Sequence, residues 1–503
     1  MRICLLTGGG YPFRRDALGG WCRTLVDGLD RHSFDLVTVT DREPPGRPAY
    51  PLPGHVTSAT AVPLGREDRR REGTDDNATA AATLLCQGLI SEPEPIAADD
   101  QFAKGLAGLA LLAESADQPL SAVPLTDVLL EAWRAGRAAG GEERLPRLSV
   151  RDARTAVALL RHAARALAVP VPDVDLVHCV GGTTPLLAAL AGRWRTGLPL
   201  LLTEARSPVS RARAGEERLS PAVRTVLRRF RRAVARTGYA EAGLIAPLSA
   251  YHHAWALGHG AEPSRLVPVP AGVDPVDFPV APEAGTPPAI VWAGTGGPDS
   301  GLRVLLEAFA AVAAAVPGTV LHLVGVTAAQ QNHCAGEIER TGLGPAVRMH
   351  ALPADARDRY ATGHLVVHVP GPADPPNRLI EAMMSGRAVV GVDVGPVAET
   401  LGDAGLLVAG NDPAALAEAC RRLLRAPARR RALGDAARRR ALACFTADRV
   451  VRVYGALYTD LAGPPPAPCY ELALAVPAPR EAQPATLRWL TAAPTAADLR
   501  RTS

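Results

Sequence analysis

The amino-acid sequence predicts an α/β protein with two doubly wound parallel sheets that face a cleft. Three observations predict this fold class. The chain has 503 residues, which is enough for two or three domains. In both halves, short apolar runs alternate with helical patterns, as in consecutive βαβ units. Between the halves, residues 280–288 are rich in Pro and Gly, as expected of a linker.

The first half begins with a predicted strand, a glycine loop and a helix. Residues 2–7 form a short apolar run, residues 8–20 hold several glycines, and residues 21–30 place apolar side chains at helical spacing. The apolar run at 34–40 predicts the second strand of this βαβ unit. Residues 41–75 are rich in Pro, Gly and Arg, and we expect them to form a loop.

A long helical region interrupts the first half. Residues 76–169 are rich in Ala and Leu at helical spacing and predict a helical insertion. Three apolar runs that follow predict strands at 174–180, 198–204 and 243–249. We therefore expect an N-terminal domain over residues 1–280 with this insertion inside it.

The second half repeats the alternation. Residues 289–294 predict a strand, and residues 302–316 predict a helix with one apolar face. Five more strands are expected at 319–326, 346–352, 365–371, 388–394 and 405–410. These elements predict a C-terminal domain over 281–445. It is followed by an amphipathic helix over 446–463, which would return to the N-terminal domain, and by a disordered tail over 464–503.

Composition bears on several classes of function. The 55 basic and 51 acidic residues nearly balance, so nothing indicates a nucleic-acid partner. The eight cysteines show no C-x-x-C spacing, and we expect buried thiols in a reducing cytosol. No uncharged apolar stretch reaches about 18 residues, so we expect no membrane span. The apolar run at the N-terminus is too short for a signal peptide, and a cytoplasmic location is expected.

Two segments of the second half carry a resemblance to a known family. Residues 291–325 (VWAGTGG to HLVG) and 380–424 (IEAMMSGRAVV to ACRRLL) resemble the donor domain of the retaining family 4 glycosyltransferases, which have the GT-B fold. In the first half, residues 175–179 and 201–204 are similar to the subgroup of the Pel exopolysaccharide glycosyltransferase. The resemblance covers most of residues 1–460.

This resemblance implies a glycosyltransferase of exopolysaccharide or glycoconjugate biosynthesis. The enzyme would move a sugar, with retention, from a nucleoside diphosphate sugar to a glycan or small-molecule acceptor. The nucleotide sugar is a substrate, so no cofactor is expected. No D-x-D-like pair stands at the end of a predicted strand, so no metal is expected either.

The resemblance also implies the residues of the donor site. The donor-binding candidates are Gly19, Gly20, Gly294, Thr295, Ser300 and Glu381. Gly19 and Gly20 precede a predicted helix, where backbone N–H groups cradle phosphate, and Glu381 would hydrogen-bond the ribose. Two simpler interpretations stay open: the glycines could form a plain tight turn, and Glu381 could serve the helix dipole.

Three residues are catalytic candidates. They are Asp374, His178 and Glu204. The first Glu of the family's E-x7-E motif falls on Ala373 by strict count, but we favour Asp374, which keeps a carboxylate if one residue is deleted. For His178, a hydrogen-bonded core histidine is the alternative.

The sequence departs from the family where cations are expected. The family places an Arg and a Lys at the positions of Thr295 and Ser300, so both charges are lost. Losing a cation at a developing charge costs several kcal/mol of transition-state stabilisation. Substitute cations are expected at Arg206, Arg211 or Arg213.

These departures leave more than one hypothesis open. The chain could be an active glycosyltransferase with substitute cations. It could instead be a degenerate homologue that acts as a binding or scaffold subunit beside a partner glycosyltransferase. A dinucleotide oxidoreductase is disfavoured, because GGGYPF at residues 8–13 does not fit G-x-G-x-x-G.

Overall fold

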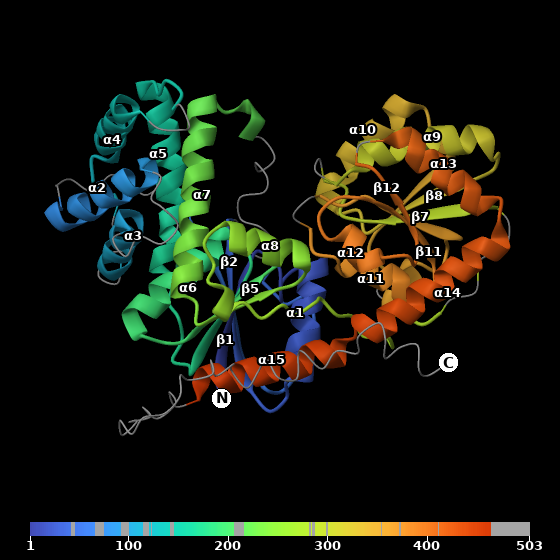
Figure 1. The fold of residues 1–503 in the computed structure, drawn as a ribbon, viewed down its shortest axis with the longest axis horizontal. Coiled ribbons are helices and arrows are strands. Elements are labelled where there is room, and N and C mark those ends of the chain that lie inside the picture. Colours follow the sequence, from blue (N-terminus) through green and yellow to red (C-terminus); the bar gives the residue numbers. More distant parts are fainter. Residues whose placement is uncertain are drawn as a thin grey trace, which may run out of the picture.

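The computed structural model contains two six-stranded parallel sheets that lie side by side (Figure 1), and this confirms the predicted fold class. The order is β3-β2-β1-β4-β5-β6 in the first sheet and β12-β11-β10-β7-β8-β9 in the second. The structure describes residues 1–41, 46–65, 75–91, 100–113, 120–121, 123–140, 145–205, 216–280, 283, 287–297, 300–353, 355–371, 374–410 and 412–463. The predicted tail at 464–503 and Arg206, Arg211 and Arg213 lie outside these residues.

The first body holds half of the strands and a large set of helices. Its strands are β1 Arg2–Gly8, β2 Ser33–Thr40, β3 Val56–Pro63, β4 Leu176–Val180, β5 Leu200–Glu204 and β6 Leu244–Pro247. Its helices are α1 Ala17–Gly28, α2 Asp76–Ile90, α3 Gln101–Leu112, α4 Leu125–Ala139, α5 Val150–Ala164, α6 Thr183–Thr196, α7 Pro221–Glu241 and α8 Ala250–Gly258.

The second body follows the linker. Its strands are β7 Ala289–Ala293, β8 Val320–Val324, β9 Val347–His350, β10 Leu365–His368, β11 Ala388–Val392 and β12 Leu406–Val408. Its helices are α9 Leu302–Ala315, α10 Gln331–Thr341, α11 Asn377–Met384, α12 Val397–Leu401, α13 Pro413–Leu424 and α14 Pro427–Cys444. The chain then continues into α15 Ala447–Ala462. No described helix is long and apolar enough to cross a bilayer.

One strand lies where the sequence predicts a loop. Residues 56–63 form β3, which pairs with β2 alone at the edge of the first sheet. Most of its side chains are small or polar and stay partly exposed, because an edge strand needs little apolar surface. The prediction of a loop over 41–75 was therefore wrong at this strand.

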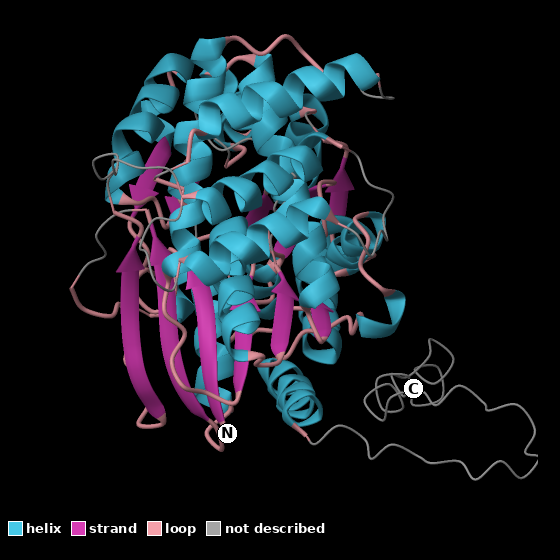
Figure 2. Ribbon diagram, turned by 90° about the vertical axis from the view of Figure 1, so that its left-hand side faces the viewer, coloured by secondary structure: helices cyan, strands magenta, loops and turns pink. Residues whose placement is uncertain are grey.

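The helices α2 to α5 occupy the region of the predicted insertion. They share one hydrophobic core with α6, α7 and strand β1, including Leu85, Leu106, Leu129 and Leu160 from the four helices. Figure 2, seen from the side of these helices, shows them stacked in front of the strands. This insertion therefore thickens one face of the first sheet.

The last helix leaves the second body and packs on the first. Helix α15 contacts α1, β4 and β5 and runs beneath the first sheet in Figure 1. The chain crosses between the bodies at two adjacent points, where the Val273 N–H donates to the Phe445 carbonyl and the Ala447 N–H donates to the Val273 carbonyl. The two crossings tie the bodies together beside the cleft.

A carboxylate from the second body caps a helix of the first. The Glu399 carboxylate on α12 accepts hydrogen bonds from the backbone N–H groups of Ala250, at 2.8 Å, and Tyr251, at 3.1 Å. The Ser249 hydroxyl accepts from the next N–H, that of His252, at 3.1 Å. Two backbone N–H groups in the first turn of α8 thus find their acceptor in the other body. The negative charge of Glu399 also complements the dipole of the helix.

Replacing Glu399 by Ala is expected to lower the free energy of unfolding by about 1 kcal/mol, as for a lost helix cap. The two bodies should also separate more readily, which raises the radius of gyration in small-angle X-ray scattering. Glu418→Ala is the control, because the Glu418 side chain is exposed and pairs with Arg421 of the same helix, α13. An unchanged radius of gyration for Glu399→Ala would contradict the idea that this contact holds the two bodies together.

Candidate functional site

Two adjoining pockets lie between the two bodies. The glycine-loop pocket lies at the carboxyl ends of β7 and β10 and is named after the loop that follows β7, which holds Gly294, Gly296, Gly297 and Gly301. Its volume is about 920 Å³ including space open to solvent. The glutamate pocket, about 820 Å³ by the same measure, lies between α1, residues 272–278 and α11. Both pockets are lined by Asp16, Ala17 and Arg378. Ligands of doubly wound sheets bind outside the carboxyl ends of strands, so this cleft is the candidate site.

The structure brings most of the predicted residues to this cleft. The glycine-loop pocket is lined by Gly294, Thr295, Ser300 and Asp374, and the glutamate pocket by Gly20 and Glu381. Gly19, His178 and Glu204 line neither pocket. The sequence-based candidates from the second body therefore share one surface.

The glycine loop after β7 depends on glycine at two positions. Gly296 has φ +81°, and a Cβ there would lie 2.5 Å from the Cys334 Sγ. Gly301, the N-cap of α9, has φ +69°, and a Cβ there would lie 2.4 Å from a Val369 methyl group. Residues with a side chain rarely adopt this backbone conformation. Glycine therefore lets the loop pass close to α10 at Gly296 and close to the end of β10 at Gly301.

The helix next to the first glycine loop begins earlier than predicted. Helix α1 begins at Ala17 rather than Trp21, and Asp16 is its N-cap. The Gly19 N–H donates to the Asp16 carboxylate at 2.6 Å, and the Gly20 N–H donates to the Asp16 carbonyl. The prediction that Gly19 and Gly20 offer their N–H groups to phosphate is therefore corrected. Asp16 and Ala17, at the start of the helix, are the residues of this segment that line the glycine-loop pocket.

Asp374 sits in the loop between β10 and α11. Its carboxylate accepts a hydrogen bond from the Gly371 N–H at 2.8 Å, which folds the loop into a turn at the rim of the glycine-loop pocket. The side chain is exposed. Ala373, the alternative for the first motif Glu, lies outside the described residues.

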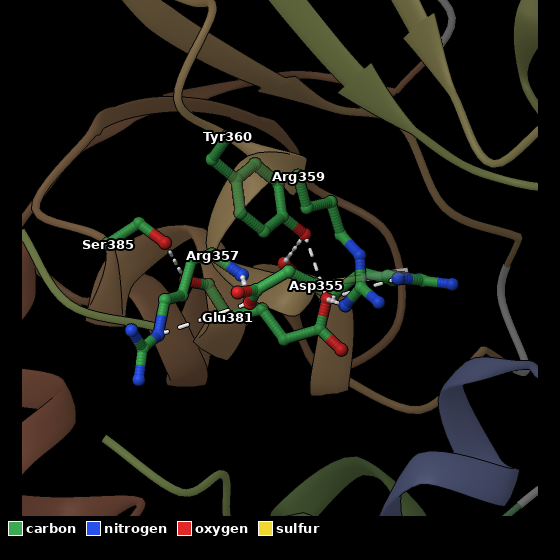
Figure 3. A network of polar contacts seen from close by, with 7 residues as sticks. Asp355, Arg357, Arg359, Tyr360, Glu381 and Ser385 are labelled. Atoms are coloured by element: carbon green, nitrogen blue, oxygen red, sulfur yellow. Dashed lines mark hydrogen bonds and ion pairs between the residues drawn. The ribbon is translucent and has the colours of Figure 1, made fainter. Parts of the chain in front are cut away.

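Glu381 is the centre of a buried polar network (Figure 3). One carboxylate oxygen accepts hydrogen bonds from Arg359, from the Tyr360 hydroxyl at 3.0 Å and from Arg378 at 3.2 Å. The Ser385 hydroxyl donates to the Glu381 backbone carbonyl at 2.9 Å. Helix α11 thus presents this carboxylate to the glutamate pocket in a fixed position.

The charge state of Glu381 follows from this network. Burial alone would raise its pKa, but the charges of Arg359 and Arg378 and the donated hydrogen bonds hold the pKa below its ordinary value. Glu381 is therefore an anion at neutral pH. An anionic acceptor of this kind can receive hydrogen bonds from ligand hydroxyl groups.

His178 lies in the core. It is fully buried in β4, and its two ring nitrogens bond to the Tyr458 hydroxyl and the Thr203 hydroxyl, both at 2.7 Å. Its ring also stacks on Tyr454. Burial lowers the pKa of His178 to about 3, so the ring is neutral. We correct the catalytic expectation for His178, because one nitrogen bonds to Tyr458 of α15, the other bonds to Thr203 of β5, and His178 lines neither pocket.

Glu204 is also buried, at the end of β5. Its Oε2 accepts a hydrogen bond from the Tyr239 hydroxyl at 2.7 Å, and Oε1 has no partner among the described residues. Burial raises the pKa of Glu204 to about 8, against the lowering effect of the Tyr239 bond. The carboxyl is therefore largely protonated at neutral pH, away from both pockets, and the geometry does not support the expected catalytic role.

Each half of the chain matches a model of a known protein family. Residues 1–264, more than half of the 503-residue chain, match the family model described as a domain of unknown function, DUF3492. The chain belongs to this family. In the same DUF3492 chain, residues 287–426 match the model of glycosyl transferases group 1. No curated protein matches the chain significantly.

Solved glycosyltransferase structures share the fold. Sucrose-phosphate synthase from Thermosynechococcus elongatus superposes with a TM-score of 0.59 at 17% identity, covering 92% of this chain and 98% of its own. HepE from Anabaena, solved in complex with UDP, gives 0.54 at 13%, with coverages of 92% and 100%. WaaG, a glycosyltransferase involved in lipopolysaccharide biosynthesis, gives 0.54 at 14%, also covering 92% and 100%. At such identities the likeness establishes the GT-B fold.

Sequence reasoning missed several charged residues of the cleft, among them Asp16, Arg359 and Arg378. A sequence signal existed for Arg378, because it precedes Glu381 by three residues and the i, i+3 spacing puts both on one face of a helix. Arg359 pairs with Glu381 from 22 positions upstream, and no local spacing indicates that contact.

Proposed function

We propose that this chain is a retaining glycosyltransferase that moves a sugar from a nucleoside diphosphate sugar to an acceptor hydroxyl. The observation that carries the proposal is the shared cleft, in which Glu381, the glycine loop and Asp374 line adjoining pockets. In this proposal, residues 1–280 form the acceptor side and residues 281–445 the donor side. In this proposal the chain is grouped with the family 4 enzymes and, within them, with the subgroup of the Pel exopolysaccharide glycosyltransferase.

Each part of the cleft has a role in this proposal. Glu381 accepts hydrogen bonds from the ribose hydroxyls of the donor. The N–H groups at the start of α1, with the Thr295 and Ser300 hydroxyls, hydrogen-bond the phosphates. Asp374 lies at the rim, where it would contact the donor sugar. Two buried polar atoms of residues that line the glutamate pocket, Asn377 Oδ1 and Trp21 Nε1, have no partner among the described residues, which suits a polar ligand.

The transfer would break the bond between the anomeric carbon and the diphosphate oxygen. The diphosphate leaves with that electron pair, and the acceptor oxygen bonds to the anomeric carbon on the same face. The acceptor proton passes to an oxygen of the leaving diphosphate.

The buried described cysteines are free thiols, and they support our proposal of a reducing, cytoplasmic location.

A binding or scaffold subunit is the second candidate. The observation in its favour is that Thr295 and Ser300 in the glycine-loop pocket carry no charge. Such a subunit would keep the fold and bind a partner glycosyltransferase without turnover, because function depends on the site and not on the fold.

Donor binding separates the two candidates. Calorimetry of the full chain with UDP, GDP, ADP and dTDP is expected to find one nucleotide that binds, with UDP tested first because HepE has been solved with UDP and with UDP-glucose. Thermal unfolding should then shift upward with that nucleotide, by linkage. Hydrolysis of the matching sugar nucleotide would support an enzyme. Failure of all four at millimolar concentration would overturn the transferase proposal in favour of the scaffold.

A further inference from the structure

We propose that Arg378 is the cation that binds the terminal phosphate of the donor diphosphate and neutralises it as it leaves. This inference rests on the proposed glycosyltransferase function. A diphosphate that departs with an electron pair gains negative charge, and a preorganised cation aimed at that charge lowers the barrier. The hydroxyls of Thr295 and Ser300 can donate hydrogen bonds but supply no charge.

The position of Arg378 fits this role. It lines both pockets, and among the described residues of the glycine-loop pocket it is the one Arg or Lys. Arg359 lines the glutamate pocket but not the glycine-loop pocket. A donor whose ribose lies at Glu381 and whose phosphates extend toward Thr295 therefore passes Arg378.

The Arg378 side chain is held in place before any ligand arrives. One of its Nη atoms donates to the Glu381 carboxylate at 3.2 Å, and the side chain is 13% exposed. A guanidinium has five N–H donors, and this ion pair uses one of them. Arginine also matches phosphate with two parallel hydrogen bonds, which adds geometric fit to the charge.

The surroundings keep Arg378 charged. Burial alone would lower the pKa of Arg378, but Glu381, Tyr360 and Asp16 raise it by more than burial lowers it. The pKa of Arg378 is therefore above its ordinary value. Asp16, at the N-cap of α1, lines the same two pockets. The N-terminus of α1, which is capped by the Asp16 carboxylate, and Arg378 therefore border the cleft together, and Arg378 supplies the positive charge for an anion.

The test compares nucleoside diphosphates with monophosphates. The probes are UDP, GDP, ADP and dTDP and their monophosphates, titrated into the full-length wild type and Arg378→Ala. For the nucleotide that binds, we expect Arg378→Ala to lower diphosphate affinity by about tenfold to a hundredfold, as for lost hydrogen bonds to a charged group. Monophosphate affinity should change little, so the ratio of diphosphate affinity to monophosphate affinity should fall by about the same factor.

Arg359→Ala is the matched control, because Arg359 pairs with the same carboxylate but lines the glutamate pocket only. It should weaken both ligands equally and keep the ratio. If Arg378→Ala is unfolded by circular dichroism, Arg378→Met repeats the test with a longer side chain. A ratio unchanged in the Arg378 variant overturns this inference and leaves the proposed function standing. If none of the diphosphates binds the wild type, the proposed function itself fails.

Discussion

Replacing Glu381 by Ala is expected to lower the free energy of unfolding by about 3–5 kcal/mol, the cost of removing one partner from a buried ion pair. The substitution leaves the guanidinium groups of Arg359 and Arg378 without their shared carboxylate. The Tyr360 hydroxyl loses its acceptor as well. Urea denaturation of the full chain, followed by circular dichroism, measures this loss.

The same substitution is expected to abolish nucleotide binding, because the ribose loses its acceptor. Glu381→Gln separates the two effects. It keeps an oxygen acceptor at nearly the same size, so it should be more stable than Glu381→Ala and should bind the nucleotide more weakly than the wild type. A loss below about 1 kcal/mol for Glu381→Ala would contradict a structural role for the network. Nucleotide affinity equal to the wild type in the folded variant would contradict the ribose assignment.

The stabilisation that Glu204 contributes is expected to fall as the pH rises from 5 to 9, while buried histidines with lowered pKa values, such as His178, act in the opposite direction up to about pH 6.5. The folded state holds the pKa of Glu204 at about 8, against an ordinary value of 4.5. The folded state therefore binds a proton that the unfolded chain has released. The stabilisation is complete below about pH 4.5 and is lost as the pH rises through about 8. A change of that size corresponds to at most about 5 kcal/mol.

Glu204→Gln mimics the protonated carboxyl and should remove this pH dependence. In urea denaturation at pH 5, 7 and 9, the unfolding free energy of the wild type should fall relative to that of the variant as the pH rises. Glu262→Gln is a suitable control, since the Glu262 side chain is 57% exposed. Parallel pH profiles for Glu204→Gln and the wild type would mean that Glu204 is ionised in the folded protein.

The two-sheet fold could be predicted because its signal is local. Strands buried between helices are continuous apolar runs, and the runs at β1, β4, β7 and β10 mark the sheet centres. Strand β3 escaped prediction because it is an edge strand with small, polar and partly exposed side chains. The start of α1 was placed four residues late, because its N-cap Asp16 precedes the apolar residues that show helical spacing.

The side of the cleft formed by the second body could also be predicted in part, since Gly294, Thr295, Ser300, Asp374 and Glu381 lie in segments that resemble a known family. Their shared surface agrees with that expectation. The roles assigned to them are still predictions until binding is measured.

The sequence by itself determined the fold class, the glycine loop and the position of Glu381, because short-range apolar patterns and motif spacing encode them. Only the tertiary structure decided which charges meet in the cleft. Asp16 and Arg378 are far apart in the chain and line the same pockets. His178 belongs to the core because Tyr458, 280 positions later, packs against it. Contacts between residues so far apart in the chain depend on how helices pack on sheets, and no local spacing in the sequence predicts them.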